Sequence, residues 1–265
     1  MTKPNVLVLT GHGINCDYEA EHAFNLAGAQ ARRVHVNDII DGHYNLDDYQ
    51  ILVFPGGFSY GDDIAAGRVL ANKCRTTLGE PLQKFVDDDK LIIGICNGFQ
   101  VMMQLGLFGK RLGDRVGTLS FNDSGRFEDR WVHLKAETKN CVFTRDIDQV
   151  YYPVAHGEGK FMSDAATVDG LFANGQVVFR YVTPEGDSAN QQFPLNPNGA
   201  DGDIAGICDK TGRIFGLMPH PERFLRFTNH PHWTRIKDDV LRKGGQIPAE
   251  GQGLKIFTNA VEYFG

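Results

Sequence analysis

Residues 91–100 read LIIGICNGFQ, an apolar run that ends at Cys96, with a glycine two positions before and two positions after the cysteine. The run is typical of a strand buried on both faces of a parallel sheet, and a helical pattern follows it. A tight strand-to-helix turn strains its central residue and needs small neighbours, as in a nucleophile elbow. A lone cysteine is more often buried and inert, but the paired glycines favour a nucleophile whose thiolate is stabilised by the helix N-terminus.

Similar strand-and-turn units lie on the N-terminal side of this segment. Residues 6–9 (VLVL) are followed by Gly11 and Gly13, and residues 51–54 (ILVF) run into Pro55-Gly56-Gly57. A helical pattern follows each strand, and in the first helix Asp17 is placed to cap the free N–H groups. Alternation of this kind predicts right-handed βαβ units.

The second half of the chain has a different pattern. After about residue 110, short apolar runs such as 177–182, 204–208 and 214–218 are separated by polar turns, which indicates antiparallel or mixed pairing. Residues 187–202 are rich in Asn, Pro and Gly and predict a surface loop. We therefore predict an α/β fold, a mostly parallel sheet flanked by helices with a mixed or antiparallel extension, and a single domain over residues 1–265.

Composition excludes several classes of protein. The 265 residues are 42% hydrophobic and 23% charged, with a formal net charge of −6, which disfavours nucleic acid or an anionic membrane as a partner. No apolar run is long enough to span a membrane, and the five cysteines form no CxxC pair. We expect reduced thiols, a cytoplasmic location and no metal site. The segment from Gly11 to Gly13 lacks the third glycine of a dinucleotide loop, so we also expect no cofactor in this chain.

A thiolate nucleophile needs a base, and the base needs an orienting acid. His220 and Glu222 lie in the segment MPHPE, residues 218–222, directly after an apolar run. In extended chain, residues two apart share a face, so Glu222 can hold the His220 ring. The more common explanation of such a histidine is a loop residue without catalytic role. The glycines at 56 and 57 end a strand at the same predicted sheet edge, where free backbone N–H groups suit an oxyanion hole.

Four segments in this order resemble the class I, or triad, glutamine amidotransferases, whose fold is flavodoxin-like. They are PGGFSYGDD (55–63), GICNGFQ (94–100), AHGEG (155–159) and MPHPER (218–223). Within that family, the run from Gly57 to Asp63 and the NGFQ that follows Cys96 are similar to the glutaminase subunits of phosphoribosylformylglycinamidine synthases, which act in purine biosynthesis. The resemblance covers nearly the whole chain.

The resemblance implies a role for each residue. Cys96, His220 and Glu222 would form the catalytic triad, and the N–H groups of Gly57 and Asn97 the oxyanion hole. The substrate L-glutamine would be contacted by Gly56, Phe58, Gln100, His156 and Gly157.

The same resemblance implies a partner. Ammonia would pass to a separate synthetase subunit that uses ATP and Mg²⁺. A small adaptor subunit is a further candidate partner. Two alternatives are a cysteine hydrolase or chaperone of a related α/β fold, and a glutaminase-like binding module without turnover.

Overall fold

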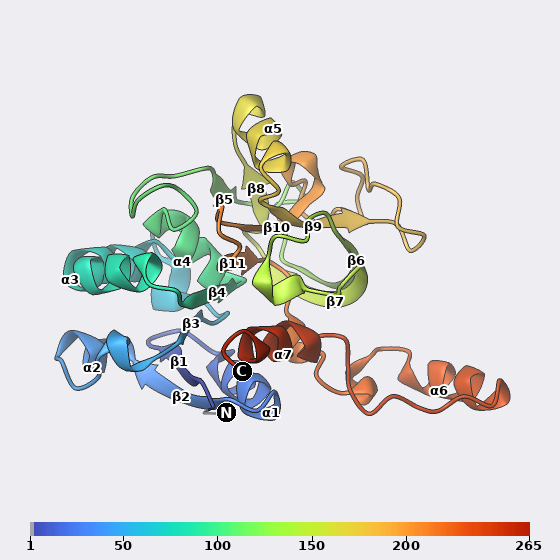
Figure 1. The fold of residues 1–265 in the computed structure, drawn as a ribbon. Helices are drawn as coiled ribbons and strands as arrows, with labels where there is room; N and C mark the ends of the chain where they lie inside the picture. The colour runs from blue at the N-terminus through green and yellow to red at the C-terminus, as the bar shows by residue number, and fades with distance from the viewer. Residues whose placement is uncertain (1–2) are drawn as a thin grey trace.

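The computed structural model describes residues 3–265, and its centre is a nine-stranded sheet of order β2-β1-β3-β4-β11-β10-β9-β6-β7 (Figure 1). Five strands run parallel: β2 (Gln30–His35), β1 (Asn5–Thr10), β3 (Ile51–Phe54), β4 (Leu91–Ile95) and β11 (Ile214–Leu217). Strands β1, β3, β4 and β11 are almost entirely buried because helices cover both faces of this part of the sheet. The prediction of an α/β fold with a parallel sheet is confirmed.

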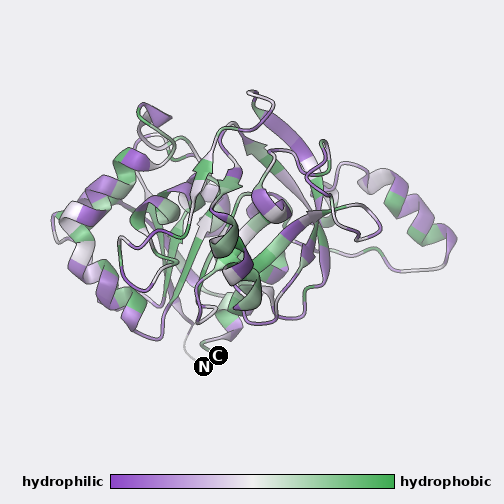
Figure 2. Cartoon of the chain, turned by 90° about the horizontal axis from the view of Figure 1, so that it is seen from above, coloured by the Kyte–Doolittle hydropathy of each residue, from purple (hydrophilic) through white to green (hydrophobic). Residues whose placement is uncertain are grey.

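The parallel strands are joined by helices in the order expected for βαβ units. α1 (Asp17–Leu26) follows β1, α2 (Val36–Ile40) follows β2, α3 (Arg68–Asp87) follows β3, and α4 (Asn97–Leu105) follows β4. α1 packs against the C-terminal helix α7 (Leu254–Glu262), where Phe24 and Phe257 meet edge to face, and α3 packs against α4. The two ends of the described chain lie close together beside this layer (Figures 1 and 2).

The second half of the chain extends the sheet with antiparallel strands. These are β10 (Ile204–Cys208), β9 (Val177–Val182), β6 (Glu128–Ala136) and β7 (Gln149–His156). β11 pairs parallel with β4 and antiparallel with β10, so the predicted mixed pairing is present. A small second sheet joins β5 (Thr118–Ser120) to β8 (Lys160–Met162), and α5 (Ala165–Ala173) lies beyond it.

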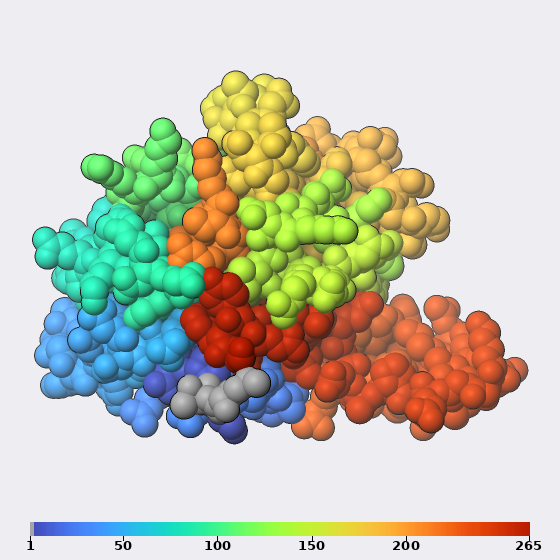
Figure 3. Space-filling model, in the orientation of Figure 1, coloured from blue at the N-terminus to red at the C-terminus, as the bar shows by residue number. Residues whose placement is uncertain are grey.

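Residues 224–252, between β11 and α7, form a long excursion that extends away from the rest of the molecule. It contains α6 (Trp233–Arg242), none of whose residues is buried, and it protrudes to one side in the space-filling view (Figure 3). Its base lies along the edge strand β7, where the Gln252 side chain accepts a hydrogen bond of 3.0 Å from the N–H of Tyr151.

One local prediction was wrong and a second was right only in part. Asp17 does not cap α1: Cys16 is the N-cap residue, and the buried Asp17 carboxylate instead accepts a hydrogen bond of 3.4 Å from Arg33. The segment 187–202 is a loop up to the 3-10 helix Asp201–Asp203, as predicted, but only part of it lies at the surface. Asn196 and Asn198 are buried within it, and their side chains satisfy backbone groups of the same segment, which allows irregular chain to pack in the interior.

Candidate functional site

The nucleophile elbow is formed as predicted, between β4 and α4. Cys96 has φ 52° and ψ −108°, a left-handed backbone that non-glycine residues rarely adopt. A Cβ on Gly98 would lie 1.7 Å from the carbonyl oxygen of Phe54, and one on Gly94 would lie 2.2 Å from the sulfur of Met102. No larger residue fits at these two positions. The turn therefore holds the Cys96 thiol at the N-terminus of α4, where the helix dipole favours the thiolate.

His220 reaches the same sheet edge because β11 is the parallel neighbour of β4. Its Nδ1 lies 2.5 Å from Oε1 of Glu222, and both side chains are almost completely buried. Burial alone lowers the pKa of His220, but the charges of Glu222 and then Cys96 outweigh it and hold that pKa well above its ordinary value. His220 Nε2 has no hydrogen-bond partner among residues 3–265, which leaves it free for proton transfer.

Two backbone N–H groups at the site also have no hydrogen-bond partner among residues 3–265. Asn97 is the first residue of α4, so its N–H has no partner within the helix. The carbonyl oxygen of Gly56 accepts hydrogen bonds from the N–H groups of Asn15 (3.3 Å) and Cys16 (3.1 Å). The carbonyl of Gly56 and the N–H of Gly57 belong to one trans peptide and point in opposite directions. The two hydrogen bonds to Gly56 therefore direct the Gly57 N–H away from Asn15 and Cys16. Gly57 lines the same cavity as Cys96.

This cavity has a volume of about 160 Å³ and lies between the elbow and the end of β7. Most of the predicted substrate residues line it, namely Phe58, Gln100, His156 and Gly157. Gly56 does not line it. A Cβ on Gly56 would lie 2.8 Å from His220 Cε1 and 3.1 Å from Cys16 Sγ, so Gly56 instead leaves room for the histidine ring behind the cavity.

Both the oxygen and the nitrogen of the Gln100 side-chain amide are hydrogen-bonded to other groups of the protein. Its Oε1 accepts a hydrogen bond of 2.8 Å from Asn97 Nδ2, and its Nε2 donates one of 2.6 Å to the carbonyl oxygen of Glu158. The Asn97 side chain in turn accepts from the N–H of Ser59 and donates to Asp62. Gln100 and Asn97 therefore tie the elbow to both loops that border the cavity.

Several residues at the site were not assigned a role from the sequence, among them the charged residues Asp62, Glu158 and Arg223. Arg223 donates a hydrogen bond of 3.1 Å to the sulfur of Cys16, and Asp62 and Glu158 line the cavity. Cys16 lies shortly after the strand at residues 6–9, but nothing in the sequence indicated that Arg223 reaches it. Cys16, His220 and Glu222 each place one potential metal-ligand atom within 4.8 Å of the others. Since Glu222 occupies Nδ1 and the Arg223 guanidinium faces Cys16, the arrangement favours proton transfer over a bound cation.

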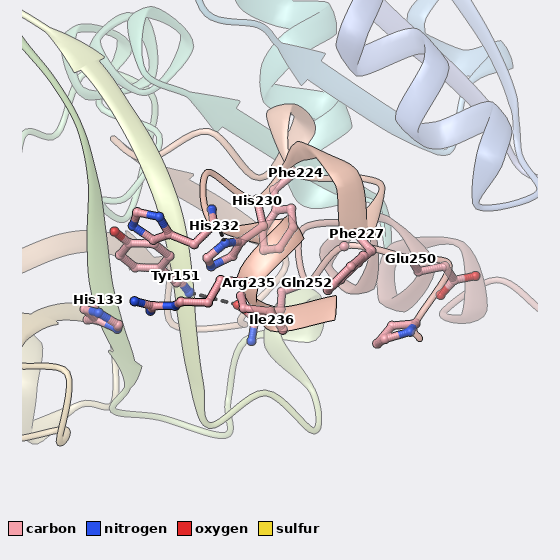
Figure 4. Close-up of a pocket in the computed structure, with 12 residues that line it drawn as sticks. His133, Tyr151, Phe224, Phe227, His230, His232, Arg235, Ile236, Glu250 and Gln252 are labelled. Carbon is pink, nitrogen blue, oxygen red and sulfur yellow. Dashed lines mark hydrogen bonds between the residues drawn. The ribbon is translucent and has the colours of Figure 1, made fainter. Parts of the chain in front are cut away.

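A second, larger cavity of about 700 Å³ lies between β6, β7 and the base of the C-terminal excursion, and it shares no lining residue with the Cys96 cavity (Figure 4). Histidines and aromatic rings line it, among them His133, Tyr151 and His230. No predicted site residue lies there, so its size alone does not make it the chemical centre.

Comparison with known proteins agrees with the geometry. Residues 3–264 match the family described as the CobB/CobQ-like glutamine amidotransferase domain. The phosphoribosylformylglycinamidine synthase subunit PurQ of Methanococcus maripaludis is 51% identical over 98% of this chain and 97% of its own length. The subunit of the same name from Dehalococcoides mccartyi is 46% identical, over 99% and 98%.

Solved structures include PurLQS from Thermotoga maritima, in which the matching chain has a TM-score of 0.72 and 32% identity, with both chains covered completely. A glutamine amidotransferase from Thermotoga maritima, at 16% identity over 99% of this chain and 92% of that one, shares the fold with a TM-score of 0.51. The chain belongs to the CobB/CobQ-like glutamine amidotransferase family.

Proposed function

We propose that this chain is the glutaminase subunit of a phosphoribosylformylglycinamidine synthase, which hydrolyses glutamine and delivers ammonia to a separate synthetase subunit. The observation that carries the catalytic assignment is the joint placement of Cys96, the His220–Glu222 pair and two free N–H groups at one sheet edge. The names and coverage of the relatives support the place in purine biosynthesis.

The geometry supports a two-step hydrolysis. The Cys96 thiolate attacks the side-chain amide carbon of glutamine, and the N–H groups of Gly57 and Asn97 stabilise the oxyanion that forms. His220, protonated and held by Glu222, gives its proton to the departing nitrogen, so that ammonia leaves and a glutamyl thioester remains. His220 then takes a proton from water, whose oxygen attacks the thioester carbon. The C–S bond breaks, and glutamate and the Cys96 thiolate are released.

The walls of the cavity suggest how glutamine is held. Phe58 supplies an apolar surface, and the N–H of Gly157 has no partner among the described residues, so it is available to the substrate carboxylate. Gln100 acts through the loops that it ties together, since its own amide is already hydrogen-bonded. His156 is buried beside Gly157, and Gly56 makes room for the catalytic ring.

The remaining assignments concern the chain as a whole. We propose that this chain needs no metal or cofactor of its own. The partner synthetase uses ATP and Mg²⁺, and a small adaptor subunit completes the complex. A cytoplasmic location is supported by five free cysteines, as expected in a reducing compartment. Among the described residues, no helix is long and apolar enough to cross a membrane. One sheet with strands from both halves supports a single domain over residues 1–265.

Cys96→Ser tests the catalytic assignment in the assembled complex. We expect loss of glutamine-dependent product formation, because serine lacks the acidity of the thiol, whereas ammonium salt should still support synthesis. Cys74→Ser, a buried cysteine in α3, is the matched control and should keep both activities. Retained glutamine use by the Cys96 variant would refute the assignment, and loss of both activities would point to a damaged complex.

A further inference from the structure

The charged side chains that line the Cys96 cavity are all acidic. Asp62 and Glu158 both line it, whereas none of the described residues that line it is lysine or arginine. The two carboxylates come from opposite loops, one after β3 and one after β7. Neither forms an ion pair with another described residue. A positively charged group of a bound molecule would therefore meet two carboxylates and no competing cation among the described lining residues.

Each carboxylate is positioned through one oxygen and keeps the other free. Asp62 Oδ1 accepts hydrogen bonds from Asn97 Nδ2 (3.2 Å) and from the N–H of Gly67 (3.4 Å). Glu158 Oε2 accepts one of 3.3 Å from the N–H of Ala66. Among residues 3–265, no hydrogen bond reaches Asp62 Oδ2 or Glu158 Oε1. Burial, together with the negative charge of Glu158, raises the pKa of Asp62 despite the opposing Gly67 N–H, as expected for two carboxylates without a cation between them.

A third acceptor lines the same cavity. Asn122 Nδ2 donates to the carbonyl oxygens of Arg126 and His156, so Asn122 Oδ1 must face His156 Nδ1 and accept its proton, at 3.1 Å. The His156 Nε2 is then a bare acceptor, and it is buried without a partner among the described residues. Burial lowers the pKa of His156 to about 3, and the ring stays neutral. An unpartnered acceptor in the same cavity as two free carboxylate oxygens indicates a ligand group rich in N–H donors.

Asn97 and Gln100 connect Asp62 and Glu158 to the elbow at Cys96. Asn97, which follows Cys96 directly, contacts Asp62 through its side chain, and it contacts Gln100, which holds the backbone of Glu158. A glutamine whose amide carbon meets Cys96 Sγ has its α-ammonium group at the other end of a three-carbon chain. That group carries one positive charge and three N–H donors.

We propose that Asp62 and Glu158 bind the α-ammonium group of free glutamine and thereby select it over glutamine whose amino group is missing or acylated. The proposal rests on the role of the Cys96 cavity given above and adds its amino-acid specificity. Peptide-bound glutamine has an uncharged amide nitrogen at this position, so it leaves both carboxylates unpaired. The cavity would thus protect glutamine residues of other proteins from hydrolysis.

The test compares two substrates across matched variants of the full chain in its complex. L-Glutamine is compared with 4-carbamoylbutanoate, which has hydrogen in place of the α-amino group, in Asp62→Asn, Glu158→Gln and the double variant. Each substitution keeps the shape and removes the charge. We expect KM for glutamine to rise about 10- to 100-fold per substitution, as for loss of a charged hydrogen bond, with kcat little changed and no loss for the analogue. Affinity of slowly hydrolysed ligands is read from protection of Cys96 against alkylation.

Asp63→Asn is the control, because Asp63 is the exposed neighbour of Asp62 in the same loop, and it should leave both substrates unaffected. An undiminished preference for the α-amino group in the double variant would overturn the proposal. Equal losses for both substrates would also overturn it, since they would show a structural role for the loop. Failure of the Cys96 assignment is separate, because it would appear as glutamine use by Cys96→Ser.

Discussion

Replacement of Glu222 by glutamine tests the coupling between the base and its orienting acid. In the structure Glu222 Oε1 lies 2.5 Å from His220 Nδ1, and both side chains are shielded from water. A carboxylate only accepts at this position, so it fixes the proton on Nδ1 and directs Nε2 toward the nucleophile. An amide removes the negative charge, and its NH₂ group can face Nδ1 and reverse the tautomer.

The magnitude follows from the type of hydrogen bond that is lost. A buried hydrogen bond to a charged group contributes about 1.5–3 kcal/mol, which corresponds to a factor of about 10–150 in rate. We expect kcat for glutamine hydrolysis by Glu222→Gln to fall by at least this factor, with a further loss from the wrong tautomer. The pKa of His220 should also fall, because the charge that raises it against burial is gone. The thiolate of Cys96 then loses its cationic partner.

Two assays check these outcomes. Steady-state ammonia release gives kcat, and the rate of Cys96 alkylation by iodoacetamide as a function of pH reports the thiolate. Alkylation by the variant near neutral pH should be slower than by the wild type. Glu80→Gln, an exposed position on α3, is the control. An unchanged kcat together with an unchanged alkylation profile would refute the coupling of Glu222 to His220.

Three further outcomes are expected. Gly57→Ala should lower kcat about 10²–10³-fold with glutamine binding retained, because the substitution displaces an oxyanion donor. Gly57 has φ 149°, and the new Cβ would lie 2.7 Å from the Gly13 oxygen. A kcat within twofold of wild type would contradict this expectation. From pH 6.5 toward 3 the wild type should lose about 1.4 kcal/mol of unfolding free energy per pH unit more than His156→Gln does, as measured in urea, because the unfolded chain protonates His156 and the folded chain does not. Equal slopes for the two proteins would contradict it. A glutamine-like diazo-ketone should modify Cys96 alone, as peptide mapping would show, since burial raises the pKa of the Cys74 thiol to about 12; labelling of Cys16 first would move the site.

The sequence by itself determined the parallel sheet, the elbow and the pairing of His220 with Glu222, because each depends on residues close together along the chain. A buried strand, a glycine-flanked cysteine and a helix form one local unit whose geometry follows from steric limits on the backbone. His220 and Glu222 are two residues apart, so their pairing is also local. That His220 reaches Cys96 was not local, because it depends on β11 pairing parallel with β4, whereas the sequence pattern indicated antiparallel or mixed pairing for that run.

Only the tertiary structure decided which distant residues surround that edge. Arg223 contacts Cys16 across 207 positions of sequence, and Asp62 and Glu158 approach the same cavity from separate loops. The interior position of Asn196 depends on hydrogen bonds within an irregular segment, which composition alone assigned to the surface. Asp17 pairs with Arg33 instead of capping α1 because β2 lies beside β1. Periodicity in the sequence indicates which face of a helix or strand a residue occupies. Which residue it contacts on that face depends on the paths of the loops and on the order of the strands.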